Sequence, residues 1–89
     1  MYVFDIATVI TSKTRLSILD LFLKTNGLEL GIRETSRRIK ANPMLTRIEL
    51  MRLEKSGLFN SRKVANSVQY SLNEDCEATA LFKKLFGVN

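Results

Sequence analysis

Two short helical segments separated by only three residues limit how this chain can fold more than any other feature. The first helix is predicted over residues 32–39 and the second over residues 43–56, with Lys40-Ala41-Asn42 between them. Asn42 is of a residue type that caps helices, and Pro43 suits a first helical position, where its missing N–H costs nothing. So short a connection predicts a helix-turn-helix.

Short strands are predicted on both sides of this helix-turn-helix, which spans about residues 32–56. Residues 58–64 and 67–72 are two strand candidates, joined at Ala65-Asn66, a sequence that tolerates left-handed backbone. Residues 28–30 alternate and are few, as in a small strand. The expected order is therefore a strand, the helix-turn-helix and a hairpin.

Helices are predicted toward the N-terminus. Residues 2–10 have an apolar face if helical, and Ser12 is expected to cap a second helix that runs to about Thr25. The second helix is expected to be the centre of the core, with two apolar rows formed by Leu16, Leu19 and Leu23 and by Ile18 and Phe22.

A terminal helix is predicted over about residues 74–86, with Asn73 as its cap. Acidic residues lie in its first turn, while Lys83 and Lys84 lie in its last turns. Both positions suit the helix dipole, which favours negative charge at the start and positive charge at the end.

Composition predicts one domain over residues 1–89. The chain is 45% hydrophobic and 26% charged, which is typical of a globular domain with a single core. No apolar run approaches the roughly 20 residues of a transmembrane helix. The first ten residues contain Asp5 and no basic residue, unlike a secretory signal. The single cysteine, Cys76, favours a reducing, cytoplasmic setting.

The residue types needed for most catalytic and metal sites are missing. The chain contains no histidine, and its four glycines lie singly and far apart. Serine and threonine therefore have no imidazole base, and no glycine-rich loop could hold a phosphate. One cysteine and scattered carboxylates give no metal-ligand spacing. We therefore expect neither an enzyme nor a built-in cofactor.

Positive charge is concentrated between residues 31 and 63. This block contains nine basic and three acidic residues, a net charge of +6 in a chain whose total is +5. Charge gathered on one structural unit produces a field that attracts a polyanion, so nucleic acid is the first partner to consider. The alternative is a solvated surface with helix ion pairs, such as Glu34 with Arg38. Of Arg37 and Arg38, one is expected to face phosphate and the other to pair locally.

The stretch from Gly31 to Asn73 resembles the DNA-binding module of ArsR-type and related archaeal and bacterial winged-helix regulators. It is also similar to winged-helix modules found beside nucleotidyltransferase domains. The resemblance rests on an ordered set of short motifs: Ser12-Lys13-Thr14-Arg15-Leu16, Ile18-Leu19, Ile32-Arg33-Glu34, Asn42-Pro43, Arg52-Leu53-Glu54-Lys55, Gly57-Leu58, Ser61-Arg62, Tyr70 and Leu72-Asn73. It implies a mainly α winged helix-turn-helix, with a three-helix core, a wing over about residues 58–72 and flanking terminal helices.

The resemblance also implies a double-stranded DNA-binding transcriptional regulator, with residues 43–56 in the major groove and residues 62–67 on the backbone or in the minor groove. A helix about 10–12 Å wide fits the major groove, which is about 12 Å across. The DNA-binding residues implied are Arg33, Arg37, Arg38, Asn42, Met44, Leu45, Arg47, Ile48, Met51, Arg52, Arg62, Lys63, Asn66 and Ser67.

The groove-facing positions depart from the family, which mostly has Ser, Thr, Arg or Gln there. Here they are Met44, Leu45, Ile48 and Met51, with Arg47 as the one strong hydrogen-bond donor. An exposed apolar helix face often marks a protein contact. The alternative function is therefore a protein–protein interaction module that uses the apolar face of helix 43–56.

Apolar residues at both ends of the chain exceed what one small core needs. We expect the surplus to form a homodimer interface, which would place two recognition helices about one DNA turn, roughly 34–36 Å, apart. The residues expected in this interface are Phe4, Ile6, Leu81, Phe82, Leu85 and Phe86.

Overall fold

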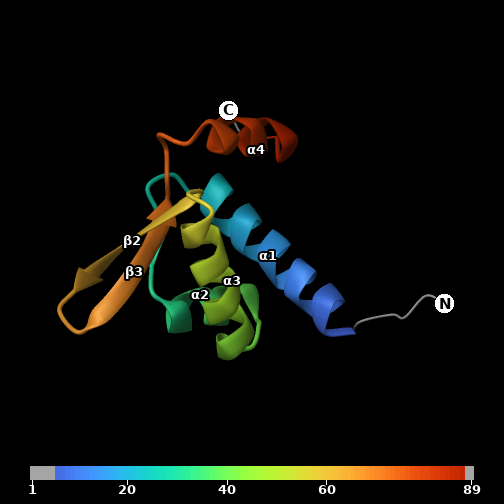
Figure 1. Ribbon diagram of the computed structural model, residues 1–89, viewed down its shortest axis with the longest axis vertical. Helices are drawn as coiled ribbons and strands as arrows, with labels where there is room; N and C mark the ends of the chain where they lie inside the picture. The colour runs from blue at the N-terminus through green and yellow to red at the C-terminus, as the bar shows by residue number, and fades with distance from the viewer. Residues whose placement is uncertain (1–5, 88–89) are drawn as a thin grey trace.

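The computed structural model describes the backbone of residues 6–87 and the side chains of residues 13–87. Within these residues, the helices pack together and a small antiparallel sheet lies to one side of them (Figure 1). The elements in chain order are α1 (Ile6–Lys24), β1 (Glu29–Leu30), α2 (Ile32–Ile39), α3 (Pro43–Lys55), β2 (Phe59–Val64), β3 (Ser67–Leu72) and α4 (Glu77–Leu85). The predicted winged helix-turn-helix is confirmed. No helix in this part of the chain has both the length and the apolar character needed to cross a bilayer.

The first helix is longer than predicted. α1 is continuous from Ile6 to Lys24, so Ser12 lies inside a helix and the expected division into two helices is wrong. No glycine or proline precedes Gly27, and nothing in the local sequence therefore stops the helix. Gly27 then ends this region with a φ of 73°, a left-handed conformation that glycine adopts without strain.

Two local features build the turn between α2 and α3. Lys40 closes α2 in the left-handed conformation, with a φ of 57°, and its N–H donates to the Arg37 carbonyl at 3.3 Å. Asn42 begins α3 as predicted, because its Oδ1 accepts the N–H of Met44 at 2.8 Å and that of Leu45 at 3.4 Å. The sequence therefore sets the start of α3 locally, while Lys40 accepts backbone strain that glycine would avoid.

The sheet has the strand order β1-β3-β2, with both pairs antiparallel. β2 and β3 pair along their whole length, from Phe59 opposite Leu72 to Val64 opposite Ser67. The two-residue turn lies at Ala65-Asn66 as predicted, and Ala65 adopts a φ of 55°. The hairpin projects from the body of the domain as a wing (Figure 1).

The core lies where α1, α3 and the sheet meet. α1 contributes four buried apolar residues in two adjacent rows, and the Phe22 ring packs edge-on against Phe59 with the centroids 4.9 Å apart. The predicted row is wrong at one end, since Leu16 is 57% exposed. The buried apolar residues are Ile18, Leu19, Phe22, Leu23, Leu30, Leu50, Leu53, Leu58, Phe59 and Tyr70.

The terminal helix starts later than predicted. α4 begins at Glu77 with Cys76 as its N-cap residue, so the expected start near residue 74 is wrong. Asn73 instead begins a separate turn, because its Oδ1 accepts the Asp75 N–H at 3.1 Å, and its carbonyl accepts the Thr79 hydroxyl at 2.6 Å. In Figure 1, α4 lies at the opposite end of the molecule from the tip of the wing.

Candidate nucleic-acid interface

One side of α3 is exposed from its first turn to its last. The opposite side is buried and carries Thr46, Glu49, Leu50 and Leu53 at helical spacing. The exposed side is a mixture of apolar and cationic groups, namely Met44, Arg47, Ile48, Met51, Arg52 and Lys55. Leu45 was also expected to face DNA, but it is half-buried and lines a hollow against α1. This side of α3 is therefore accessible to a binding partner, because the core is formed by the opposite side of the helix.

The two basic residues of the wing lie on opposite faces of the hairpin. Successive side chains alternate in a strand, so Ser61 and Lys63 share one face while Arg62 lies on the other. The Ser61 hydroxyl donates to the Glu54 carboxylate of α3, which identifies the first of these faces as the one toward α3. Lys63 therefore extends the α3 surface, and Arg62 does not.

Of the nine basic residues in the 31–63 block, five have no carboxylate of the described residues within 4.0 Å. We call these the unpaired cations: Arg33, Lys40, Arg47, Lys55 and Lys63. They come from the start of α2, the turn, α3 and the wing face toward α3. The free positive charge is thus arranged around α3 and is not spread evenly over the surface.

Arg37 and Arg38 are both paired with the same carboxylate. Arg37 Nη2 and Arg38 Nε donate to the two oxygens of Glu34, the latter at 3.1 Å. The hydrogen bond from Arg38, followed by that from Arg37, holds the pKa of Glu34 below its ordinary value of 4.5. The expectation that only one of these arginines pairs locally is therefore wrong, because Glu34 reaches both the i+3 and the i+4 positions.

Arg62 is also held by a carboxylate. Its Nε and Nη2 donate to the two oxygens of Glu29 at 2.6 Å and 2.7 Å, a bidentate pair that crosses β3 from β2 to β1. The hydrogen bond from Arg62 lowers the pKa of Glu29 and correspondingly raises that of Arg62. The guanidinium expected to contact DNA is thus neutralised by a residue that the sequence did not connect with it.

A hollow of about 520 Å³ separates the start of α2 from β3 of the wing. Arg33 lies at its edge together with polar side chains of Ser67 and Gln69. Gly31 lets the wing approach this closely, because a Cβ at that position would lie 3.3 Å from Gln69 Nε2 and 3.4 Å from the Val68 carbonyl oxygen. Arg33 and Ser67, both expected to bind DNA, are therefore brought to one site.

Comparison with solved structures assigns this geometry to a family. The homodimeric winged helix-turn-helix DNA-binding domain of a possible ArsR-family transcriptional regulator from Mycobacterium bovis matches with a TM-score of 0.65 at 23% identity, over 88% of this chain and 73% of that one. The transcriptional regulator HlyU from Vibrio vulnificus CMCP6 matches with a TM-score of 0.66 at 27% identity, over 91% and 85%. HlyU from Vibrio cholerae N16961 is 31% identical, with a TM-score of 0.64 over 88% and 83%. The chain belongs to the ArsR-like winged helix-turn-helix regulators.

The winged fold also occurs as a part of larger proteins of other kinds. Human N-acetylserotonin methyltransferase matches 78% of this chain with 20% of its own length, at 17% identity and a TM-score of 0.61. A comparison with protein-family models finds no match, and neither does a comparison with curated proteins. The regulator family therefore rests on the solved structures.

Sequence reasoning missed a buried ion pair that holds the recognition helix of this ArsR-like domain. Glu49 of α3 is fully buried, and Arg15 of α1 donates to it through Nε at 2.7 Å and Nη2 at 3.5 Å. Arg52 lies 3.5 Å from the same carboxylate. The position of Glu49 within the buried row of α3 could have indicated a buried carboxylate. Its partner Arg15 lies 34 residues away, and the sequence does not connect the two.

The residues expected to form a dimer interface are divided by the structure. Leu81 and Leu85 of α4 are 62% and 78% exposed. Phe82 and Phe86 instead pack partly against the domain's own core, so they are less available to a second chain than expected. Phe4 and the side chain of Ile6 lie outside the described residues.

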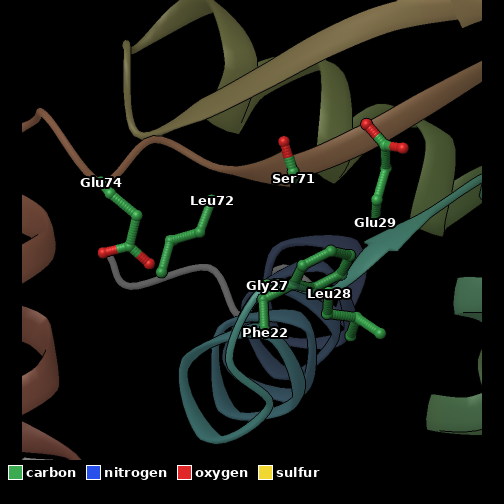
Figure 2. A pocket seen from close by; sticks show the side chains of 7 residues that line it. All are labelled: Phe22, Gly27, Leu28, Glu29, Ser71, Leu72 and Glu74. Carbon is green, nitrogen blue, oxygen red and sulfur yellow. The ribbon is translucent and has the colours of Figure 1, made fainter.

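A further hollow, of about 300 Å³, lies away from α3 beside β1 (Figure 2). Figure 2 shows Glu29 and Glu74 on opposite sides of it, with Phe22 and Leu28 below. Both carboxylates already have basic partners, Glu29 in Arg62 and Glu74 in Lys83 at 2.8 Å. No group of three potential metal ligands occurs among the described residues. The basic face around α3 is therefore the better candidate site.

Proposed function

We propose that this ArsR-like domain binds double-stranded DNA and regulates transcription by blocking or recruiting polymerase. α3 would enter the major groove, and the wing would contact the backbone or the minor groove. Arg33, Lys40 and Lys63 would bind phosphates on either side. Asn42 and Asn66 lie at the ends of this surface, the first as the cap of α3 and the second at the wing tip.

The observation that carries this proposal is the arrangement of the unpaired cations around an exposed helix of groove-fitting width. The other four basic residues of the block pair with carboxylates of the described residues, so the cations that remain unpaired there lie around the exposed side of α3. A polyanion is the partner that such a field selects. The alternative, a protein-interaction module, is not favoured by the matched regulators.

The first test is the salt dependence of binding to duplex DNA. If the five unpaired cations each neutralise one phosphate, the affinity should fall several hundredfold between 50 and 200 mM salt. The reason is that the log of the affinity falls by about 0.9 per phosphate for each tenfold increase in salt concentration. Arg47→Ala should weaken binding and reduce the slope by about one. Fluorescence anisotropy with a labelled duplex at several salt concentrations measures both quantities.

Arg33 and Arg37 provide a matched comparison on α2, because only Arg37 is paired with Glu34. Arg33→Ala should therefore weaken DNA binding more than Arg37→Ala. An affinity that is independent of salt, or of both Arg33 and Arg47, would contradict the proposal and favour the protein-interaction module.

The domain is further proposed to act as a homodimer through the exposed side of α4. The matched domain from Mycobacterium bovis is homodimeric. Leu81 and Leu85 here form an exposed apolar row that serves no purpose in the fold, and Leu16 of α1 is exposed as well. Burying such a row against a second copy would remove apolar surface from water.

Sedimentation at micromolar concentration tests the dimer. The wild-type chain should sediment at about twice 10.1 kDa, and Leu81→Glu combined with Leu85→Glu should sediment as a monomer. Both positions are exposed, so the double variant should retain its helical circular dichroism. A monomeric wild-type protein would contradict this assembly.

We also propose that the domain has no catalytic activity and works in the cytoplasm. The matched proteins are described as transcriptional regulators, and this sequence contains no histidine to act as a general base. Residues 1–89 would then act as one DNA-binding domain with no cofactor of its own.

A further inference from the structure

The exposed side of α3 contains an apolar row that the fold does not use. Met44, Ile48 and Met51 are 69%, 39% and 47% exposed and follow one another at helical spacing. We call them the apolar row of α3. A different side of the same helix packs into the core, so the apolar row of α3 is not part of the core.

Its surroundings restrict what can cover this row. Arg47 and Lys55 lie on the same exposed side of α3, Lys40 precedes the helix, and Lys63 extends the surface from the wing. None of these four has a carboxylate of the described residues within 4.0 Å. A second copy of this chain would present the same positive charge here, so charge complementarity favours an anionic occupant.

The occupant must therefore be a polyanion that also displays apolar groups at the depth a helix reaches. The major groove of DNA meets this description, because each thymine presents a 5-methyl group beside its O4 acceptor. The apolar row can contact methyl groups but cannot form bidentate hydrogen bonds. Arg47, which lies between Met44 and Ile48 in the sequence and is also exposed, can donate a hydrogen bond beside this row.

We propose that the recognition helix of this domain selects DNA by contacting thymine 5-methyl groups with Met44, Ile48 and Met51. This inference rests on the proposed DNA binding and specifies what the helix reads. Arg47 would add one hydrogen-bonded contact, and the unpaired cations would set the register on the backbone.

Uracil substitution tests the proposal, because deoxyuridine differs from thymidine only in lacking the methyl group. A bound duplex is first selected from a random pool, and its thymines are then replaced by deoxyuridine within the recognised positions. Burial of one methyl group corresponds to about a fourfold change in affinity, so removing two should weaken binding about fifteenfold. The salt dependence should stay the same, because the phosphates are unchanged.

Variants at the exposed positions of α3 provide the matching test on the protein side. Met44→Ala combined with Ile48→Ala should abolish most of the difference between the thymine and uracil duplexes. Arg47→Ala should instead weaken binding to both duplexes by the same factor. Unchanged thermal unfolding by circular dichroism would show that these variants fold, as expected for exposed side chains.

Three results would overturn the inference, and they separate it from the proposed function. Equal, salt-sensitive affinity for the two duplexes would leave DNA binding intact and contradict thymine reading alone. Salt-insensitive binding, or no binding to either duplex, would contradict both. If Ile48→Gln converted a dimer into a monomer in sedimentation, the apolar row would be covered by a second copy and not by DNA.

Discussion

Replacing Arg15 with alanine is expected to lower the free energy of unfolding by about 3 kcal/mol, the lower end of the range for breaking a buried ion pair. For a domain of this size the melting temperature should fall by roughly 10–25 °C. The substitution leaves the fully buried Glu49 carboxylate with only Arg52, which is 3.5 Å away. Urea denaturation followed by circular dichroism measures the change.

The size of this effect follows from where the two partners lie. The Glu49 side chain is completely removed from water, whereas that of Arg15 is 41% exposed. Removing the arginine therefore leaves the Glu49 carboxylate, the more deeply buried of the two charges, without its main partner. The free-energy cost of its desolvation is then no longer offset. The same pair joins α1 to α3, so we expect the variant to loosen the recognition helix as well as the core.

Two variants distinguish this explanation from a general loss of packing. Arg15→Met combined with Glu49→Met removes both charges while keeping volume, and it should recover most of the lost stability. Lys24→Ala breaks the exposed pair with Asp20 at 2.8 Å on the same helix and should leave the stability nearly unchanged. A double variant as unstable as Arg15→Ala would show that the ion pair itself is not the cause.

The helix-turn-helix could be predicted closely because its signals are local. Asn42 and Pro43 mark the start of α3 in the sequence, and the structure places the helix there with the expected cap. The same reasoning failed at Asn73, which begins a turn and not the terminal helix. It failed at Ser12 as well, where a capping residue type lies inside an uninterrupted helix. A cap residue thus identifies a helix start only where the preceding backbone leaves the helical conformation.

The electrostatics of the candidate site could not be predicted from the chain alone. The basic block was visible as a charge count, but which cations remain free depends on carboxylates that approach through the fold. Glu29 reaches Arg62 across a sheet, 33 residues away in sequence. Glu34, within four residues of Arg37 and Arg38, and Glu49, three residues before Arg52, were the partners that helical spacing could indicate.

These carboxylates are expected to limit DNA affinity, and Glu29→Gln should therefore tighten binding. The amide no longer neutralises Arg62, whose guanidinium becomes available to a phosphate. One additional phosphate contact corresponds to an increase of up to about eightfold at 0.1 M salt, with a steeper salt dependence by about 0.9. Combining it with Glu34→Gln, which releases Arg37 and Arg38, should increase both the affinity and the slope further. Anisotropy titrations at several salt concentrations measure these changes.

Glu74→Gln is the matched control, since it also adds one positive charge by neutralising a paired carboxylate. Glu74 pairs with Lys83 of α4 and not with a basic residue of the 31–63 block, so its loss frees no cation near α3 and should change the DNA affinity less than twofold. A similar gain in both variants would mean that net charge alone matters. Weaker binding by Glu29→Gln would mean that Glu29 orients Arg62 toward the DNA instead of withholding it. The direction of this one change therefore decides whether the pair between β1 and β2 restrains the wing or prepares it for binding.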